Sequence, residues 1–123
     1  MLPRKLIEDA RALRRRGKFK KALRLLENTM ITLNMTQRAC LIMCLNEQSQ
    51  CLWRTGKYAK AEVSALKAKQ LGEENPPDYD GVADALNNLG AICLERNELD
   101  QAEHFYEESY GLRENIANLE VVA

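Results

Sequence analysis

A short turn pattern occurs three times in this chain of 123 residues. The copies read GKFKKA at 17–22, GKYAKA at 56–61 and NELDQA at 97–102. In each copy a turn-forming residue is followed by a large apolar residue two positions later and by an alanine five positions later. A pattern that recurs at such an interval indicates one supersecondary unit that is repeated and stacked along the chain.

The residues around the turns also recur when the copies are aligned on Gly17, Gly56 and Asn97. A leucine stands eleven residues before each turn, a small residue seven before it and an apolar residue four before it. These intervals follow the 3.6-residue period, so the three positions share one helical face. Small residues let two helix backbones approach closely, and each copy is therefore predicted to be a helical hairpin. The small residues are Ala10, Ser49 and Gly90 before the turn, and Thr29, Ala68 and Ser109 after it.

This arrangement resembles the tetratricopeptide repeat, whose signature places a Leu-Gly pair in the first helix of a hairpin and an alanine in the second. The third copy fits best, with Leu89 and Gly90 followed by Ala102. The first two copies depart from the signature, because Ala10 and Ser49 stand where the glycine is expected. The turns lie 39 and 41 residues apart, which is longer than the common repeat of ~34 residues. This spacing is similar to the longer-repeat subclass found in kinesin light chains and bacterial tetratricopeptide regulators.

The resemblance implies an all-α fold in which three hairpins, with six helices, form a right-handed α-α superhelix over a single domain at 1–123. We expect repeat 1 at about 3–34, repeat 2 at about 37–72 and repeat 3 at about 81–116. Residues 117–123 are expected to be the start of a further helix or a tail. Either a longer array or a partner that covers the last helix is therefore predicted.

Individual residues set the expected helix boundaries. Asn34 is expected to stop the second helix, and Thr36 and Asp80 are expected to cap the helices that follow them. Gly72 is expected to end the fourth helix. The segment 72–80 contains two prolines and is the only loop that is long enough to lie apart from the stack. The expected helices span 4–16, 18–33, 37–54, 58–71, 81–96 and 99–116.

The charges are unevenly distributed, although the formal net charge is zero. Residues 1–72 carry 16 Lys or Arg against 5 Asp or Glu, and residues 73–123 carry 2 against 13. The steepest basic stretch, at 11–24, is interpreted either as a solvated helix face or as an anion-binding surface. Nucleic acid is a disfavoured partner, because the acidic half of the chain would repel its phosphates.

Few residues suit catalysis or cofactor binding. The only histidine, His104, is expected on an exposed helix face with no nucleophile placed beside it. The chain also lacks a glycine-rich phosphate loop. No enzymatic activity and no cofactor are therefore expected.

The four cysteines are interpreted as core residues. Cys40, Cys44 and Cys51 have spacings that place them on one helix face, which would permit a thiolate metal site. However, Cys93 takes the apolar position four residues before the third turn, and cysteine behaves as a small buried hydrophobe. Unpaired cysteines, the lack of an apolar run as long as a membrane span and the lack of a signal peptide predict a cytoplasmic protein with no membrane partner.

The resemblance implies a binding surface, since in that family the first helix of each hairpin lines a concave face that holds a peptide. Asn46 and Asn87 have donors and acceptors for a ligand backbone, or alternatively bond the backbone of the adjacent repeat. Trp53 is either an anchor for the partner or a packing residue between helices. Arginines would bind carboxylate or phosphate through bidentate contacts. The candidate residues are Arg11, Arg14, Arg15, Asn46, Gln50, Trp53, Arg54, Asn87 and Asn88.

These observations predict a protein-protein interaction module that holds a protein or peptide in its groove, with an acidic or carboxylate-bearing peptide as the favoured ligand. The first alternative is a homo-oligomer in which the basic repeat 1 of one copy docks on the acidic repeat 3 of another. The second is a recruitment or sensor arm of a larger regulator.

Overall fold

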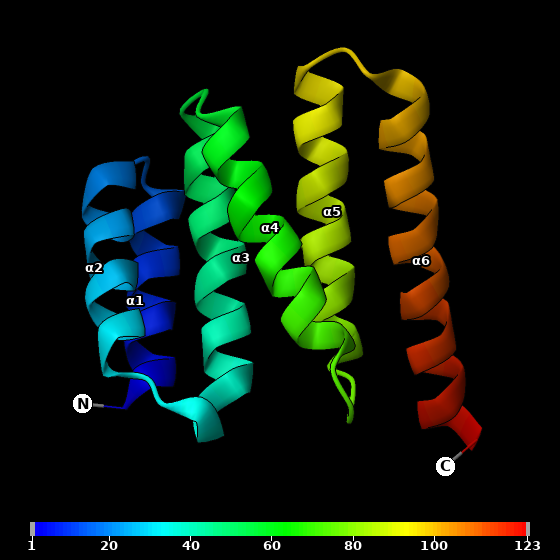
Figure 1. The fold of residues 1–123 in the computed structure, drawn as a ribbon, viewed down its shortest axis with the longest axis horizontal. Coiled ribbons are helices and arrows are strands. Elements are labelled where there is room, and N and C mark those ends of the chain that lie inside the picture. The colour runs from blue at the N-terminus through cyan, green and yellow to red at the C-terminus, as the bar shows by residue number, and fades with distance from the viewer. Residues whose placement is uncertain (1, 123) are drawn as a thin grey trace.

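The computed structural model describes the backbone of residues 2–122, and their side chains apart from those of residue 35 and residues 118–122. Its helices run in sequence order from one end of the molecule to the other (Figure 1). They are α1 (Pro3–Arg15), α2 (Phe19–Thr32), the 3-10 turn η1 (Met35–Gln37), α3 (Arg38–Arg54), α4 (Tyr58–Glu73), α5 (Tyr79–Glu95) and α6 (Leu99–Val122).

The helices pack as consecutive pairs, which confirms the predicted all-α array of hairpins. Each helix contacts the next along the chain, and α3 also contacts both α1 and α5. By contrast, the backbones of α2, α4 and α6 do not come close to one another within the described residues. The first helices of the three hairpins therefore form one continuous layer.

The three recurring turns have the same backbone conformation. Gly17, Gly56 and Asn97 have φ angles of 77°, 81° and 62°, which lie in the left-handed region that favours glycine. The residue after each turn donates its N–H to a carbonyl five residues earlier, with N···O distances of 2.9, 2.9 and 2.8 Å. This is the Schellman arrangement, which satisfies carbonyl groups left free at a helix end.

Substituting the turn glycine tests this geometry directly. A Cβ atom at position 56 would meet nothing within 4 Å, so the cost of Gly56→Ala comes from the backbone alone. We expect the free energy of unfolding to fall by about 1 kcal/mol in urea titrations, because a left-handed alanine is strained. Asn97→Gly at the matching position should change it by less than about 0.5 kcal/mol. Equal effects of the two substitutions would contradict the assignment.

The predicted small residues lie where paired helices cross. Ala10, Ser49 and Gly90 are all buried. The Ser49 hydroxyl donates to the carbonyl oxygen of Ala61 at 2.9 Å and so joins α3 to α4. A Cβ atom on Gly90 would lie 2.9 Å from a ring carbon of Tyr106. The Tyr106 ring thus occupies the space that a larger side chain at position 90 would need, which explains the small residue there.

Gly72 does not end α4, contrary to the prediction. The helix continues to Glu73, and Gly72 is buried inside its last turn. A Cβ atom at Gly72 would lie 2.7 Å from Cγ2 of Val82. This glycine is thus explained by the close approach of α4 to the start of α5.

The two predicted caps are also wrong, because each helix start is capped by an earlier side chain. Asn34 caps η1 with its Oδ1 atom, which accepts the Thr36 N–H at 3.0 Å. Asp78 rather than Asp80 caps α5, where its Oδ1 atom accepts the Gly81 N–H at 3.0 Å. Both capping residues satisfy N–H groups that have no partner within the first turn of a helix.

The segment 72–80 does not lie apart from the stack. The guanidinium of Arg38, at the start of α3, donates to the carbonyl oxygens of Leu71 at 2.9 Å and Glu74 at 3.0 Å. It also donates to the carbonyl oxygen of Pro76. The Arg38 side chain therefore caps the end of α4 and also connects the loop after α4 to the start of α3.

The last helix is longer than predicted. The backbone of α6 remains helical to Val122, past the expected end near residue 116, with no turn that would start a fourth hairpin. Residue 123 lies outside the described residues. No helix within residues 2–122 is both long and apolar enough to cross a membrane.

Candidate functional site

Side chains from α1, α3 and α5 form a polar groove of about 280 Å³ on the layer of first helices. Seven of the nine candidate residues line it, whereas Trp53 and Arg54 do not. Two acidic residues that were not among the candidates line it as well. The lining residues are Arg11, Arg14, Arg15, Asn46, Glu47, Gln50, Asp84, Asn87 and Asn88.

Glu47 is the acidic residue at the centre of this groove. Its Oε1 atom accepts a hydrogen bond from Nε of Arg11 at 2.7 Å, and its Oε2 atom accepts one from Nε of Arg14 at 2.8 Å. The Glu47 residue is only 8% exposed. Charge-assisted bonds of this length are strong, so one carboxylate fixes two arginines of the neighbouring helix.

Glu47 leaves the terminal nitrogens of both arginines without a bond, although the Arg14 side chain is only 11% exposed. Glu47 occupies only the Nε atoms of Arg11 and Arg14, and no other described residue bonds their terminal nitrogens. Arg15 is exposed beside them and forms no ion pair among the described side chains. With Glu47 and Asp84 as the acids of the groove, its three arginines leave a net charge of +1.

Asn46 and Asn88 join the second and third hairpins. The Asn46 amide donates to the carbonyl oxygen of Gly81 at 3.1 Å, and the Asn88 amide donates to the carbonyl oxygen of Asn46 at 3.1 Å. Both asparagines are buried. The alternative in which asparagine bonds the adjacent repeat's backbone therefore describes Asn46. Asn87 is partly exposed and faces the groove.

Trp53 and Arg54 lie next to the groove. Trp53 is partly buried against a cluster formed by Leu52, Ala61 and Ile92. Its indole N–H donates to Oδ1 of Asn88 at 3.4 Å, so its polar atom is used inside the protein. The guanidinium of Arg54 lies 4.8 Å from the centre of the Trp53 ring, a cation–π distance that leaves the charge exposed to solvent.

Gln50 provides an unpaired acceptor. Its Oε1 atom is buried and has no hydrogen-bond partner among the described residues. An unsatisfied buried acceptor is costly, typically 1–3 kcal/mol.

Asp84 closes the groove on the α5 side. Its carboxylate pairs with the guanidinium of Arg113 on α6. This ion pair joins α5 to α6, and Asp84 and Glu47 are the two carboxylates that line the groove.

The cysteines lie in the core as predicted, with Cys44, Cys51 and Cys93 buried and Cys40 partly buried. Burial raises the pKa of the Cys44 thiol to about 12 and that of Cys51 to about 11. Both thiols are therefore protonated at neutral pH and lack the thiolate that nucleophilic attack needs. Among the described residues, no group of three or more metal-binding side chains comes together.

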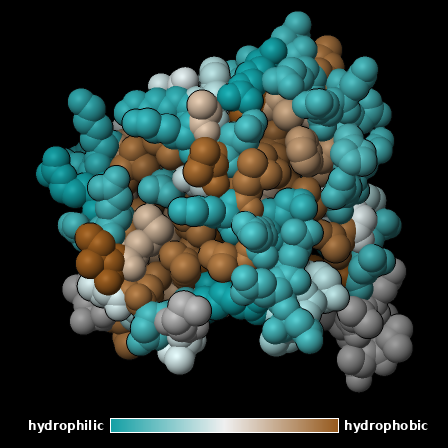
Figure 2. Space-filling model, viewed as in Figure 1, coloured by the Kyte–Doolittle hydropathy of each residue, from teal (hydrophilic) through white to brown (hydrophobic). Residues whose placement is uncertain are grey.

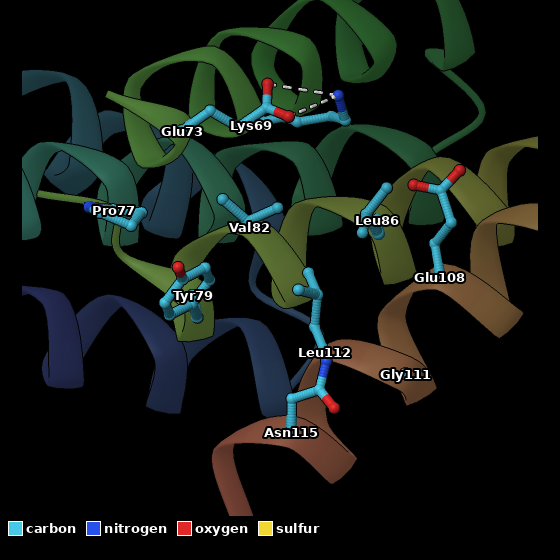
Figure 3. Close-up of a pocket in the computed structure, with 10 residues that line it drawn as sticks. All are labelled: Lys69, Glu73, Pro77, Tyr79, Val82, Leu86, Glu108, Gly111, Leu112 and Asn115. Atoms are coloured by element: carbon cyan, nitrogen blue, oxygen red, sulfur yellow. Dashed lines mark hydrogen bonds and ion pairs between the residues drawn. The ribbon is translucent and has the colours of Figure 1, made fainter. Parts of the chain in front are cut away.

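A larger cavity, of about 590 Å³, lies between α4, α5 and α6. Figure 3 shows Val82 and Leu86 between the Lys69–Glu73 ion pair of α4 and Leu112 of α6. Figure 2 shows hydrophobic residues exposed near the middle of this face of the molecule, with hydrophilic residues around them. The backbones of α4 and α6 do not come close to each other there. The lining mixes apolar side chains with polar ones, among them Glu108 and Asn115 of α6.

Glu47 and Asp84 were missed by sequence reasoning for different reasons. Glu47 is the only acidic residue in 38–54, and a single carboxylate in a helix that carries several apolar residues was a usable indication of a buried ion pair. Asp84 carried no such indication. His104 is exposed, as predicted, and contacts Glu108 one turn later.

Comparison with known families identifies one match. A family model described as tetratricopeptide repeat matches residues 37–115. The match covers the second and third hairpins, gives no support for the kinesin light chain subclass, and identifies no catalytic family. No curated protein matches the sequence.

Proposed function

This chain belongs to the tetratricopeptide repeat family, and from that premise we propose that it holds an acidic peptide segment of a partner protein in the groove along α1, α3 and α5. Domains of this family are generally protein-protein interaction modules. The observation that carries the finer proposal is the pair of guanidinium groups of Arg11 and Arg14, which Glu47 orients through their Nε atoms.

The groove has donors and an acceptor at complementary places. The terminal nitrogens of Arg11 and Arg14 suit a carboxylate, because a guanidinium binds it in a planar, bidentate manner. Arg15 adds an exposed cation next to them. Asn87 and the buried Oε1 atom of Gln50 offer partners for the backbone of an extended peptide. A carboxylate followed by an extended backbone would use all of these groups at once.

Calorimetry with an acidic peptide tests the proposal. We expect the double substitution Arg15→Ala with Arg54→Ala to weaken binding about tenfold, which corresponds to 1.4 kcal/mol. Both side chains are exposed, so the fold should be unaffected. Lys60→Ala with Lys67→Ala removes the same charge from exposed positions of α4 and should leave the affinity almost unchanged. Equal affinities for the two double variants would refute the groove as the binding site.

Self-assembly is the second candidate, favoured by the opposite charges of the two halves of the chain. The basic hairpin of one copy would dock on the acidic hairpin of the next, and such head-to-tail contacts form rings or filaments. Sedimentation velocity tests this: assembly should weaken as salt rises. A monomer at high protein concentration and low salt would eliminate the candidate.

We further propose a reducing compartment such as the cytosol, since four free thiols are carried and three are buried in the core. The wide spacing of the turns supports placing the chain in the longer-repeat subclass. The match over 37–115 is equally compatible with a recruitment arm of a larger regulator.

A further inference from the structure

An apolar groove of about 520 Å³ lies on the outer face of the third hairpin, separate from the polar groove. Leu94 and Leu99 are 51% and 56% exposed there, and Tyr110 is 66% exposed. Tyr106, whose ring packs against Gly90, also lines the groove, as do Glu103 and Glu107. Large apolar side chains that gather in one exposed groove mark an interaction site more often than scattered ones do.

The repeat register shows what kind of element covers such a face. Leu94 and Leu99 take the positions that Trp53 and Tyr58 take in the second hairpin, counted from Asn97 and Gly56. In the second hairpin this face is covered, because Trp53 and Tyr58 pack on a cluster that contains Ile92 of α5. On the equivalent face of the second hairpin, the covering element is the first helix of the next hairpin. Within residues 2–122 no helix lies on the groove of the third hairpin.

The opposite end of the array has a different surface. The positions through which α5 contacts the preceding hairpin, Ala85 and Ile92, correspond to Lys5 and Ala12 of α1. Lys5 and Ala12 are exposed, and Lys5 pairs with Asp9 at 2.9 Å. The first hairpin is therefore exposed at these positions and charged at Lys5, whereas the third hairpin exposes an apolar face.

We propose that the groove on the third hairpin binds an amphipathic helix of a partner protein, with small and apolar residues along its seam and basic residues on its flanks. The seam follows from α5, which places Ala85 and Ile92 on the equivalent face of the second hairpin. The basic flanks follow from the rim, where Glu103 and Glu107 are exposed and belong to the strongly acidic half of the chain.

A second copy of the chain fits this face less well. Docking through α1 would place Lys5 and the other polar residues of that helix over Leu94 and Tyr110. The basic residues of α1 would complement the acidic rim, but its polar residues would not complement the apolar floor of the groove. Docking of two equivalent third hairpins would instead bring the two acidic rims together. A separate helix satisfies both the apolar floor and the acidic rim.

The test uses a probe built from the chain's own α5. A peptide of the α5 sequence, residues 79–95, with Asp80→Lys, Asp84→Lys and Glu95→Lys has the required seam and basic flanks. Fluorescence anisotropy with the whole chain should show that it binds at least tenfold more tightly than the unmodified α5 peptide. Leu94→Gln with Tyr110→Gln should weaken its binding by at least tenfold.

Two controls separate this surface from its surroundings and from the polar groove. Val63→Gln with Leu66→Gln changes two residues of α4 that are 59% and 48% exposed, and it should not affect the peptide. Arg15→Ala with Arg54→Ala should also leave the affinity for this peptide unchanged, even though it weakens binding of the acidic peptide. The proposals for the two surfaces can therefore be refuted independently of each other.

Three results would overturn the proposal. The first is the same affinity for the wild-type chain and the Leu94→Gln, Tyr110→Gln variant. The second is no binding of the lysine-bearing peptide to the folded chain at any attainable concentration. The third is a wild-type dimer that becomes a monomer in that variant, which would assign the face to a second copy.

Discussion

Glu47→Ala is expected to lower the free energy of unfolding by about 3 kcal/mol, because removal of one partner from a buried ion pair leaves the other charge uncompensated. Here two charges are affected. Arg11 and Arg14 each lose a charge-assisted hydrogen bond to Glu47, and Arg14, whose side chain is only 11% exposed, keeps a positive charge with little access to water. Urea unfolding followed by circular dichroism measures the difference.

The matched control for this variant is Glu62→Ala. Glu62 also pairs with an arginine of another hairpin, at 2.8 Å from Arg96, but its side chain is 42% exposed. Exposed ion pairs contribute at most about 1 kcal/mol, so this variant should remain close to the wild type. A loss of stability at Glu62 as large as that at Glu47 would mean that burial of the Glu47 pair has no special role.

Ile92→Ala is expected to destabilise the protein by about 3 kcal/mol, in the range for large-to-small substitutions in a core. The Ile92 side chain is fully buried against Leu52 and Ala61, so the substitution opens a cavity between the second and third hairpins. In urea, the midpoint should fall while the slope stays the same, as for a chain that unfolds in a single transition.

Leu94→Ala, on the same helix, serves as the reference for Ile92→Ala. Leu94 is 51% exposed, so its truncation opens little cavity and should lower the free energy of unfolding by less than about 1 kcal/mol. If both substitutions leave the midpoint of urea unfolding unchanged, the hairpins do not depend on the contact at Ile92 for their stability. If Ile92→Ala instead lowers the slope, the third hairpin unfolds separately from the others.

The hairpins could be predicted from the sequence because their causes are local. The turns at Gly17, Gly56 and Asn97 need a left-handed residue at one position, and the buried small residues recur at fixed distances from it. Such constraints repeat with the chain and are visible in a single sequence. Helix ends were less predictable, since Asp78 and Asp80 are equally good caps by residue type and only the path of the loop selects between them.

The interactions that were missed join residues far apart in the sequence. Arg38 caps a helix end that lies 33 residues later, and Glu47 contacts arginines 33 and 36 residues earlier. Asn46 and Asn87 have equivalent positions in the repeat, yet Asn46 is buried against Gly81 and Asn87 is partly exposed. Identical positions in a repeat differ wherever the neighbouring hairpins present different side chains.

The two surfaces differ in the chemistry that they can recognise. The groove on α1, α3 and α5 is polar and has a net positive charge, whereas the groove on the third hairpin has an apolar floor and an acidic rim. Because the two surfaces share no lining residues, the two proposed ligands would not compete for the same side chains.

The most direct test of the central claim is a nuclear magnetic resonance titration of the isotope-labelled chain with an acidic peptide. If α1, α3 and α5 form the partner-binding groove, the amide signals that shift should include those of Arg15, Gln50 and Asn87, while signals from the outward faces of α4 and α6 stay in place. Shifts confined to α2, α4 and α6, with the signals of these three residues unmoved at saturation, would contradict the account.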